Sequence, residues 1–188
     1  MFEGCGTALV TPFRRGGALD EPALRRLVRR QVEAGISFLV PCGTTGESPT
    51  LNRAEHLRVV EITLEEAHGL VPILAGAGGY NTAEVIDLAR ELAALGVDGI
   101  LSVTPYYNKP TQEGLYQHYK AIAASVAVPI IVYSVQGRTG VNVEPATLRR
   151  LSTIDNIVGV KEASGNIGQI AAAVSYTHLR AHETVLDL

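Results

Sequence analysis

Short apolar runs rich in β-branched residues alternate with longer helix-type stretches, and this alternation constrains the fold more than any other feature of the sequence. The apolar runs begin near residues 6, 37, 71, 99, 129 and 156, so they recur every 27 to 34 residues. Apolar residues between them have helical spacing, as at Leu24, Leu27 and Val28. The pattern predicts helices at 21–35, 53–68, 82–95, 112–126, 144–151 and 166–174.

The first three predicted helices carry start signals. Asp20 precedes the first helix and Pro22 lies in its first turn, while Asn52 and Asn81 precede the second and third. Short polar side chains accept hydrogen bonds from the unpaired N–H groups at a helix start. Proline suits the first turn because the N–H group that it lacks would have no partner there. We therefore expect helices to begin at these positions.

The apolar runs are continuous rather than alternating, which is typical of parallel strands buried on both faces. Six βα units leave two architectures open, a doubly wound sheet and a (β/α)8 barrel. Residues 11–17, after the first strand, do not form the G-x-G-x-x-G of dinucleotide-binding folds, and residues 76–81 lack its last glycine. We therefore predict an α/β protein with a (β/α)8 TIM barrel. Such a barrel takes about 250 residues, so we expect an incomplete one without strands seven and eight.

The 188 residues are expected to contain one partial barrel domain over 1–174. Residues 175–188, SYTHLRAHETVLDL, have no apolar strand run, and we interpret them as a non-native tail left by a frameshift or a chimeric join. His178 and His182 have the i, i+4 spacing of a metal site, but the glutamate of H-E-x-x-H and a third ligand are lacking. We expect no metal site there.

Composition argues against several function classes. The net charge of −3 gives no basic surface for nucleic acid, and no apolar run reaches the about 18 residues of a membrane span. The N-terminus lacks a basic leader, so we expect a cytoplasmic protein. Two cysteines, Cys5 and Cys42, are too few for a disulfide framework and are expected to be small buried thiols. The doubled arginines at 25–26, 29–30 and 149–150 are expected on solvated helix faces.

The sixth apolar run, Ile157-Val158-Gly159-Val160, ends in Lys161. Lysine is rarely buried without a partner because desolvation disfavours the ammonium. The same desolvation turns a lysine amine into a nucleophile that forms a Schiff base with a carbonyl. The alternative interpretation is that Lys161 begins a solvated loop and pairs with Glu162.

Polar side chains also follow three other strands, at the end where a barrel places its catalytic groups. Residues 43–48 (GTTGES) follow the second strand, 104–110 (TPYYNKP) the fourth and 133–140 (YSVQGRTG) the fifth. Each segment also has a purely structural interpretation, as a turn with local hydroxyl bonds, a core tyrosine pair or an exposed turn. Because all of them fall at the same end of successive strands, we favour a functional site.

These side chains suit imine chemistry. An amine in a water-poor site condenses with a ketone, and the iminium is an electron sink for making and breaking C–C bonds. Phenols and hydroxyls can move the protons, and an arginine fork can hold a substrate carboxylate. The sequence shows no phosphate-binding G-x-x-x-x-G-K motif and no metal-ligand cluster. We therefore expect no cofactor.

The motifs GTTGES, TPYYNKP, Y-x-V-x-GRTG and GVKEAS occur in this order, and residues 3–174 resemble the dihydrodipicolinate synthases, pyruvate-dependent class I aldolases of lysine biosynthesis. The resemblance implies a homotetrameric lyase that condenses pyruvate with L-aspartate 4-semialdehyde to 4-hydroxy-tetrahydrodipicolinate. Lys161 would form the covalent imine with pyruvate. Tyr133, Thr44 and Tyr107 would relay protons, with Tyr107 supplied across a subunit interface.

The same resemblance implies substrate binding by Gly43, by Thr45 at the pyruvate carboxylate and by Arg138 at the carboxylate of aspartate semialdehyde. Ser134 and Gln136 depart from the asparagine and proline that the family usually has. Losing the proline removes a fixed φ from the loop that carries Arg138, so we expect this arginine to be less preorganised.

In some members of the family lysine inhibits through a site that the resemblance maps to Ser48, His56, Glu84 and Tyr106. Arg53 and Tyr80 replace a histidine and an asparagine commonly found there. We therefore expect no strong inhibition by lysine.

Two alternatives stay open. A sister lyase acting on a sugar acid would share the lysine and the tyrosine, but Arg138 disfavours it because a polyhydroxylated chain needs hydroxyl-binding groups. The second alternative is an inactive fragment of the synthase, because a barrel without strands seven and eight cannot close and leaves the edges of strands one and six unpaired. On this ground we expect the 188-residue chain to be inactive or insoluble and its full-length parent to be active.

Overall fold

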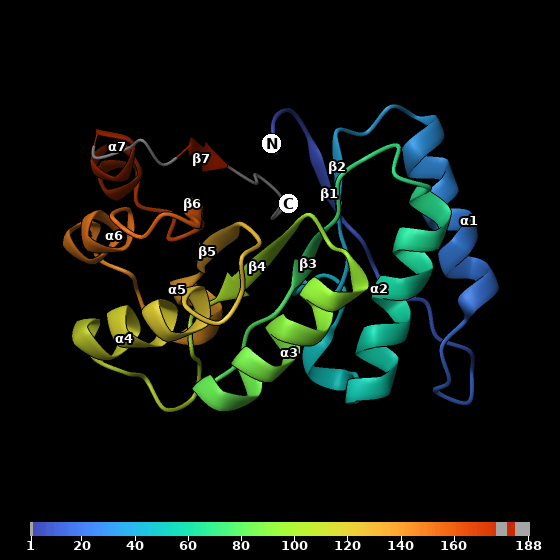
Figure 1. Cartoon of the computed structure of the whole chain (residues 1–188), viewed down its shortest axis with the longest axis horizontal. Coiled ribbons are helices and arrows are strands. Elements are labelled where there is room, and N and C mark those ends of the chain that lie inside the picture. Colours follow the sequence, from blue (N-terminus) through green and yellow to red (C-terminus); the bar gives the residue numbers. More distant parts are fainter. Residues whose placement is uncertain (1, 176–179, 183–188) are drawn as a thin grey trace. The chain divides into compact units, whose positions relative to one another are not determined.

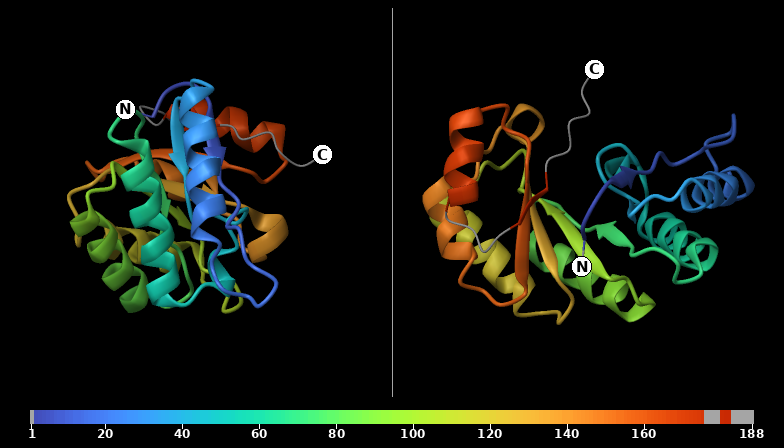
Figure 2. Two further views of the ribbon diagram at one scale, coloured as in Figure 1. Left: turned by 90° about the vertical axis from the view of Figure 1, so that its right-hand side faces the viewer. Right: turned by 90° about the horizontal axis from the view of Figure 1, so that it is seen from above.

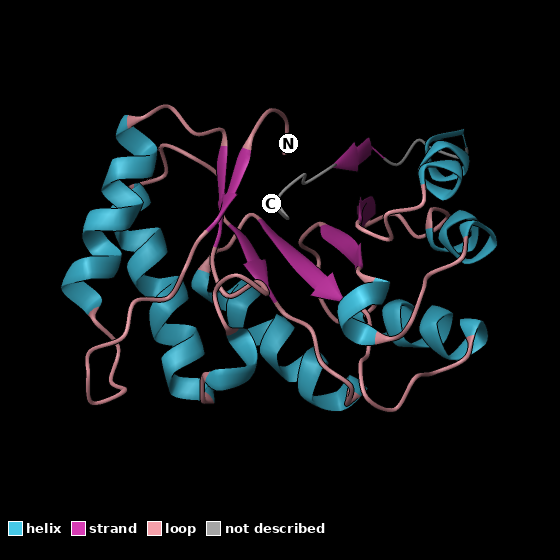
Figure 3. Ribbon diagram, turned by 180° about the vertical axis from the view of Figure 1, so that it is seen from behind, coloured by secondary structure: helices cyan, strands magenta, loops and turns pink. Residues whose placement is uncertain are grey.

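The computed structural model describes residues 2–175 and 180–182. Strands and helices alternate along the chain, as Figures 1 and 3 show. The chain forms two compact units, each described by itself below: Met1–Gly76 with Glu91–Ile100, and Ala77–Arg90 with Leu101–Leu188.

The first unit is built from short parallel strands, each followed by a helix. The elements are β1 (Gly6–Ala8), α1 (Glu21–Glu33), β2 (Phe38–Val40), the 3-10 helix η1 (Ser48–Thr50), α2 (Arg53–Ala67) and β3 (Leu74–Gly76). β1 and β2 pair in parallel with Gly6 opposite Phe38, and Leu39 of β2 bridges in parallel to Ile73. Its core includes Val28 of α1 and Val60 of α2, which are fully buried.

The predicted helix starts are confirmed. Asp20 Oδ1 accepts the N–H group of Ala23 at 3.1 Å. Asn52 begins α2 with a reciprocal arrangement, in which its side chain accepts from the N–H of Glu55 while the Glu55 carboxylate accepts from the N–H of Asn52. At the third helix, Asn81 Oδ1 accepts from the N–H of Ala83 at 3.1 Å.

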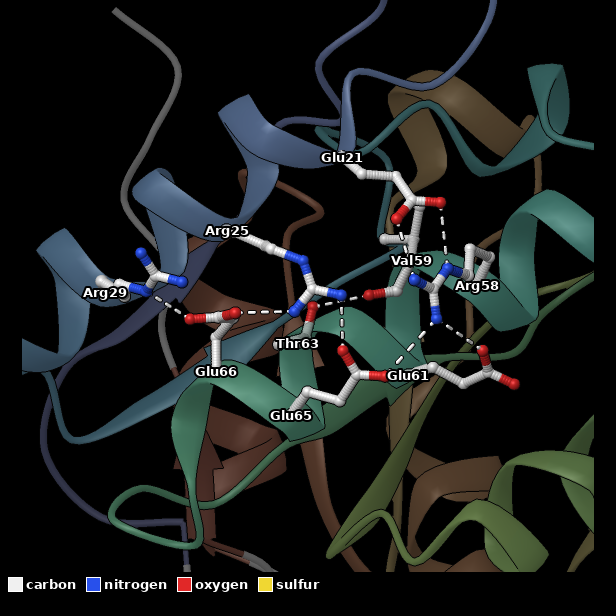
Figure 4. Close-up of polar contacts among 9 residues, drawn as sticks. All are labelled: Glu21, Arg25, Arg29, Arg58, Val59, Glu61, Thr63, Glu65 and Glu66. Atoms are coloured by element: carbon white, nitrogen blue, oxygen red, sulfur yellow. Dashed lines mark hydrogen bonds and ion pairs between the residues drawn. The ribbon is translucent and has the colours of Figure 1, made fainter.

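Helices α1 and α2 lie side by side (Figure 2) and are joined by arginine–glutamate ion pairs (Figure 4). Arg25 Nη1 lies 2.6 Å from Glu66 Oε1, and Arg29 pairs with the other oxygen of the same carboxylate. Arg58 Nη2 lies 2.8 Å from Glu21 Oε2. The expectation of a solvated arginine face is therefore wrong for Arg25, which is 27% exposed because it folds onto α2.

The second unit continues the alternation. Its strands are the rest of β4 (Gly99–Val103), β5 (Ile130–Ser134), β6 (Ile157–Glu162) and β7 (Arg180–His182), and its helices are the first part of α3 (Thr82–Leu95), α4 (Gln112–Ala123), α5 (Gln136–Thr139), α6 (Pro145–Leu151) and α7 (Ile167–Ser175). The strands β4, β5, β6 and β7 are neighbours in that order. Helices α6 and α7 lie together on one side of β5 and β6 (Figures 1 and 2).

The six predicted strands and six predicted helices are all found, and the boundaries differ by no more than a few residues. The structure adds the short helix α5, where a turn was the structural alternative, and β7, where no strand is expected. β7 pairs in parallel with β6, as an edge strand with unpaired N–H and C=O groups allows. That residues 175–188 are non-native stays a prediction.

The cysteines follow the prediction at one position. Cys42 is a buried free thiol, and burial raises its pKa to about 12. The prediction is wrong for Cys5, whose side chain is exposed, while its backbone N–H and carbonyl bond to Ser37.

Two further observations concern the described residues alone. Residues 2–175 hold no group of three or more His, Cys, Asp or Glu side chains arranged to bind a metal ion. His178, from the spacing considered above, lies outside the described residues. None of the described helices combines the length and the apolar character needed to cross a bilayer.

Candidate active site

Tyr133 and Lys161 are direct neighbours at the carboxyl ends of β5 and β6. The parallel register places Tyr133 opposite Lys161, and the lysine Nζ lies 4.3 Å from the centroid of the tyrosine ring. Tyr133 is 7% exposed and Lys161 is half-buried. The backbone around them is held by the N–H group of Thr104, which donates to the carbonyl of Tyr133 at 3.0 Å. The pairing that links the two predicted catalytic residues is therefore built into the sheet.

Glu162, the next residue along β6, is turned away from Lys161 because successive strand side chains point to opposite faces. Its side chain is 5% exposed. One carboxylate oxygen accepts the N–H group of Ser164 at 2.6 Å, and the other accepts Nε2 of Gln169 at 2.8 Å. These contacts therefore do not favour the alternative in which Glu162 is the ion partner of Lys161.

Arg138 lies in the one-turn helix α5, and its side chain is exposed. Thr139 braces this turn, since its hydroxyl donates toward the carbonyls of Val135 and Val141 and also accepts the N–H of Val141. Gly140 ends the helix with φ +69°, in the left-handed region that glycine adopts without strain. The loop thus has a defined conformation without the proline that the family usually has.

Tyr107 projects from the loop after β4 and is 89% exposed. Its φ is +66°, which is rare for an aromatic residue, and the N–H of Asn108 donates across it to the carbonyl of Tyr106 at 2.8 Å. The interpretation of Tyr106 and Tyr107 as a core pair is therefore wrong for Tyr107. A strained backbone that holds a large aromatic side chain outward is typical of functional loops.

Tyr106 and Glu84, two of the candidate allosteric residues, belong to a second cluster in the same unit. The rings of Tyr80 and Tyr106 meet edge to face with centroids 5.4 Å apart, and Asn108 Nδ2 donates to the carbonyl of Tyr80. Burial raises the pKa of Tyr106, with further contributions from Tyr80 and Glu84. Glu84 is exposed and accepts Nδ2 of Asn81 at 2.9 Å.

The GTTGES segment belongs to the first unit and forms overlapping turns after β2. The N–H groups of Gly46 and Glu47 donate to the carbonyls of Gly43 and Thr44 at 3.1 Å each. Thr44 and Thr45 are exposed, and Gly43 is half-buried. Gly46 is needed because a Cβ there would lie 3.0 Å from the carbonyl oxygen of Leu9 and from the backbone nitrogen of Cys42. The turn therefore presents both threonine side chains to solvent within this unit.

The other two candidate allosteric residues also lie in the first unit. Ser48 begins η1 and is half-buried. His56 is buried on α2, and its Nε2 lies 2.9 Å from the carbonyl oxygen of Gly76. Burial lowers the pKa of His56, although the bond to the Gly76 carbonyl opposes the change. This histidine has the contacts of a core residue.

The structure thus brings Lys161 and Tyr133 into direct contact and places Arg138 and Tyr107 in the same unit. Gly43, Thr44 and Thr45 belong to the other unit. Sequence reasoning missed Gln169 and Asn142 behind the strand ends. It named Glu162 only as a possible ion partner of Lys161, and Ser134 only as a departure from the family pattern. The amides Asn142 and Gln169 carry no signal in the sequence, because 27 residues separate them.

Parallel βα units with reactive side chains at the carboxyl ends of the strands define the class of (β/α)-barrel enzymes. Within that class, the chain belongs to the dihydrodipicolinate synthetase family, whose model matches residues 1–182.

Curated relatives extend this result. The chain is 60% identical over 170 residues to the 4-hydroxy-tetrahydrodipicolinate synthase of Koribacter versatilis, which covers 90% of this chain and 57% of the relative. It is 55% identical over 170 residues to the synthase of Syntrophus aciditrophicus, covering 90% and 58%. The chain therefore spans less than two thirds of the length of these relatives. Their shared name favours the synthase over the sugar-acid lyase.

Solved structures agree. A dihydrodipicolinate synthase from Thermotoga maritima matches with a TM-score of 0.91 and 51% identity over 94% of this chain and 60% of that one. The enzyme from Acinetobacter baumannii in complex with pyruvate matches with a TM-score of 0.93 and 43% identity, covering 97% and 64%. The predicted TIM-barrel class, with about six βα units in this chain, is confirmed.

Proposed function

We propose that these residues belong to a 4-hydroxy-tetrahydrodipicolinate synthase that condenses pyruvate with L-aspartate 4-semialdehyde through an imine on Lys161. The contact between Lys161 and Tyr133 carries the proposal. An aromatic face attracts an ammonium group, so the ring holds the amine at the strand end. The names of the curated relatives support the choice of reaction.

The chemistry follows from an amine beside a phenol. Lys161 Nζ attacks the keto carbon of pyruvate and forms a C–N bond, and the keto oxygen leaves as water once it has been protonated. The iminium acidifies the methyl group of pyruvate, and loss of one proton gives an enamine. The enamine carbon then attacks the aldehyde carbon of the second substrate, which forms the new C–C bond, and the aldehyde oxygen takes a proton to become a hydroxyl. The amine of the second substrate then adds to the imine carbon and displaces Lys161, which closes the ring and breaks the C–N bond to the lysine. The Tyr133 hydroxyl hydrogen-bonds the imine and moves protons together with Thr44 and Tyr107.

The remaining roles follow the same reaction. Arg138 offers an exposed guanidinium for the carboxylate of aspartate semialdehyde, and Thr45 and Gly43 hold the pyruvate carboxylate. The outward, strained Tyr107 suits a residue that enters the site of a neighbouring subunit in a homotetramer. The imine itself serves as the electron sink, so the proposal includes no cofactor, and its metabolic role is in the cytoplasm. The candidate lysine site at Ser48, His56, Glu84 and Tyr106 is proposed to respond weakly.

Borohydride trapping tests this proposal. The full-length parent is incubated with pyruvate and reduced with borohydride. Its intact mass is measured by mass spectrometry, and the modified peptide is then sequenced. We expect one reduced pyruvyl adduct on Lys161 and none in Lys161→Ala. A folded, full-length parent that gives no adduct, or an adduct on another lysine, contradicts the imine role. The Koribacter versatilis relative, treated in parallel, shows whether the trapping conditions are adequate. Turnover assays with aspartate semialdehyde and with sugar acids then test the second substrate.

A further inference from the structure

We infer that Gln169 is a positioning residue that ties the end of the Lys161 strand to the segment that follows Arg138. The inference rests on the proposed imine chemistry. Gln169 comes from α7, outside every motif that carries the family resemblance. Its side chain bonds to Glu162, the residue after Lys161, and to Asn142, four residues after Arg138.

The side-chain amide of Gln169 bonds to two partners at once. Its Nε2 donates to Glu162 Oε2 at 2.8 Å and to Asn142 Oδ1 at 2.9 Å, while its Oε1 accepts from Asn142 Nδ2 at 2.7 Å. Both amide hydrogens are thereby used. Both oxygens of Glu162 accept hydrogen bonds, so this side chain fixes which end of the Gln169 amide faces it. The orientation of Gln169 in turn fixes the orientation of Asn142.

On the strand side, the contacts brace the turn between β6 and α7. Glu162 Oε1 accepts the N–H of Ser164 at 2.6 Å, Ser164 Oγ accepts the N–H of Asn166 at 3.1 Å, and Asn166 Oδ1 accepts the N–H of Gln169 at 3.1 Å. Each step is a local side-chain bond to the backbone, of the kind that stabilises turns. The backbone that leaves Lys161 is therefore fixed from Glu162 onward.

On the arginine side, Asn142 belongs to a segment that is anchored at several points. Its carbonyl accepts Nε2 of Gln112 at 2.8 Å. The next residue, Val143, donates its N–H to Ser134 Oγ, directly after Tyr133. Thr139 joins this segment to the helix turn that carries Arg138. The segment is thus rigid in itself, and Gln169 connects it to the turn behind Lys161.

This connection has a chemical consequence. Forming a C–C bond requires the amine that holds one substrate and the guanidinium that holds the other to keep a fixed separation. Gln169 links the two supports through one planar amide, so removing it loosens both at the same time. The loss affects imine formation and the binding of the second carboxylate, with little effect on any site elsewhere in the chain.

Gln169→Leu in the full-length parent tests the assignment, with Gln117→Leu as the matched control. Gln117 is an exposed glutamine that bonds Glu113 on α4, away from these contacts. We expect Gln169→Leu to slow borohydride trapping of pyruvate about tenfold and to speed hydrogen exchange at the amides of Ser164 and Val143 by about the same factor. Gln117→Leu should leave both unchanged. If Gln169→Leu fails to fold, Gln169→Asn is measured instead, because its amide is too short to reach both partners.

Rescue distinguishes positioning from a general loss of stability. The double variant E162Q/Q169E restores a donor–acceptor pair between the same two positions. We therefore expect the trapping rate, and the protection of the Ser164 and Val143 amides from hydrogen exchange, to recover in part. Trapping at the wild-type rate in Gln169→Leu, or no recovery in the double variant, overturns the inference. No adduct with the wild-type protein removes the proposed imine chemistry, and the positioning role with it. The exchange data then still decide whether Gln169 joins the two segments.

Discussion

The two compact units hold their elements together with different chemistry. In the first unit, α1 and α2 are joined by arginines and glutamates, with Glu66 between Arg25 and Arg29 (Figure 4). In the second, the contacts behind Lys161 are hydrogen bonds, in which the buried Glu162 accepts from the N–H of Ser164 and from Nε2 of Gln169. A buried neutral histidine, His118, lies on α4 against Thr82 of α3.

The difference teaches what each arrangement can tolerate. Ion pairs near the surface respond to salt and acid because water and ions screen them. Hydrogen bonds in fixed amide geometry do not depend on ionic strength, and each removed partner leaves a buried group unpaired. The unit that carries Lys161 and Tyr133 therefore uses the chemistry that keeps geometry constant. The predictions below separate the two arrangements.

The largest expected effect comes from acid acting on His118. Burial lowers its pKa to about 4. Its side chain is 5% exposed, Nδ1 lies 2.8 Å from Thr82 Oγ1, and Nε2 has no hydrogen-bond partner among the described residues. Between pH 6.5 and 4 the unfolded chain binds a proton at His118 that the folded chain does not. The free energy of unfolding must therefore decrease as the pH falls. We expect the second unit to lose about 3 kcal/mol between pH 7 and 4.

Urea denaturation at pH 7, 5.5 and 4, followed by residue-resolved NMR, measures this loss. His118→Asn cannot titrate in this range, so its stability should change little between pH 7 and 5.5. Equal pH dependence in the variant and the wild type contradicts the assignment of the effect to His118.

Glu162→Ala gives the next largest effect. The substitution leaves the N–H of Ser164 and one donor of Gln169 without their partner in a buried site. We expect the free energy of unfolding to fall by about 2 kcal/mol, and the loss should be the same in 0.1 M and 1 M NaCl. Urea denaturation at both salt concentrations measures it. Glu113→Ala removes an exposed carboxylate from the same unit and serves as the control. If the decrease in the free energy of unfolding disappears in 1 M NaCl, Glu162 stabilises the unit through its charge, as the ion pairs of the first unit do.

The fold could be predicted from the sequence because local signals agree with it. Continuous apolar runs, the caps Asp20 and Asn52 and the helical spacing on α1 each specify their own element. Lys161 and Tyr133 could be predicted as a pair because both end parallel strands, and parallel register brings strand ends together. The support behind them could not be predicted. Gln169 and Asn142 meet only after two helices and a strand have folded, and neither residue type has a preference that indicates the contact.

Two errors have the same origin. Arg25 has the residue type and spacing of a solvated face, and only the position of Glu66 on α2 turns it inward. Tyr107 follows Tyr106 just after an apolar strand, and the left-handed backbone at Tyr107 decides that its side chain points out. Both outcomes depend on contacts or strain that a linear pattern does not contain.

Glu66→Gln tests the charged arrangement and is expected to have a smaller effect. Hydrogen bonds from Arg29 and Arg25 lower the pKa of Glu66 to about 2. Because the pKa of Glu66 is lower in the folded chain than in the unfolded chain, the ionised carboxylate stabilises the fold above the unfolded pKa of about 4.5. This stabilisation is lost as the pH falls toward 2. The Glu66 side chain is buried, but its partners Arg25 and Arg29 are 27% and 55% exposed. Solvent therefore screens the pairs, and the loss at pH 7 should not exceed about 1 kcal/mol.

Urea denaturation of the wild type and Glu66→Gln at pH 7, 4 and 2.5 checks this window. The difference between them should shrink with acid and also in 1 M NaCl. Glu55→Gln, at the capping box of the same helix α2, is the control, because the Glu55 carboxylate accepts from the backbone N–H of Asn52. A difference that persists at pH 2.5 would mean that packing, and not charge, joins the two helices.

Gln136→Pro is expected to have the smallest effect, because it acts on one turn. Gln136 is the first residue of α5, the position where proline fits a helix, and Thr139 and Gly140 already define the turn. Because proline restricts the unfolded chain, the substitution should raise the free energy of unfolding of the second unit by about 0.5 kcal/mol. A small rise in the midpoint temperature of thermal unfolding measures this gain. Val135, with ψ 71°, must move toward the extended values that precede proline. If the proline instead destabilises the second unit, the change required at Val135 costs more free energy than the restricted unfolded chain contributes. In that case the loop with Gln136 no longer accommodates a proline.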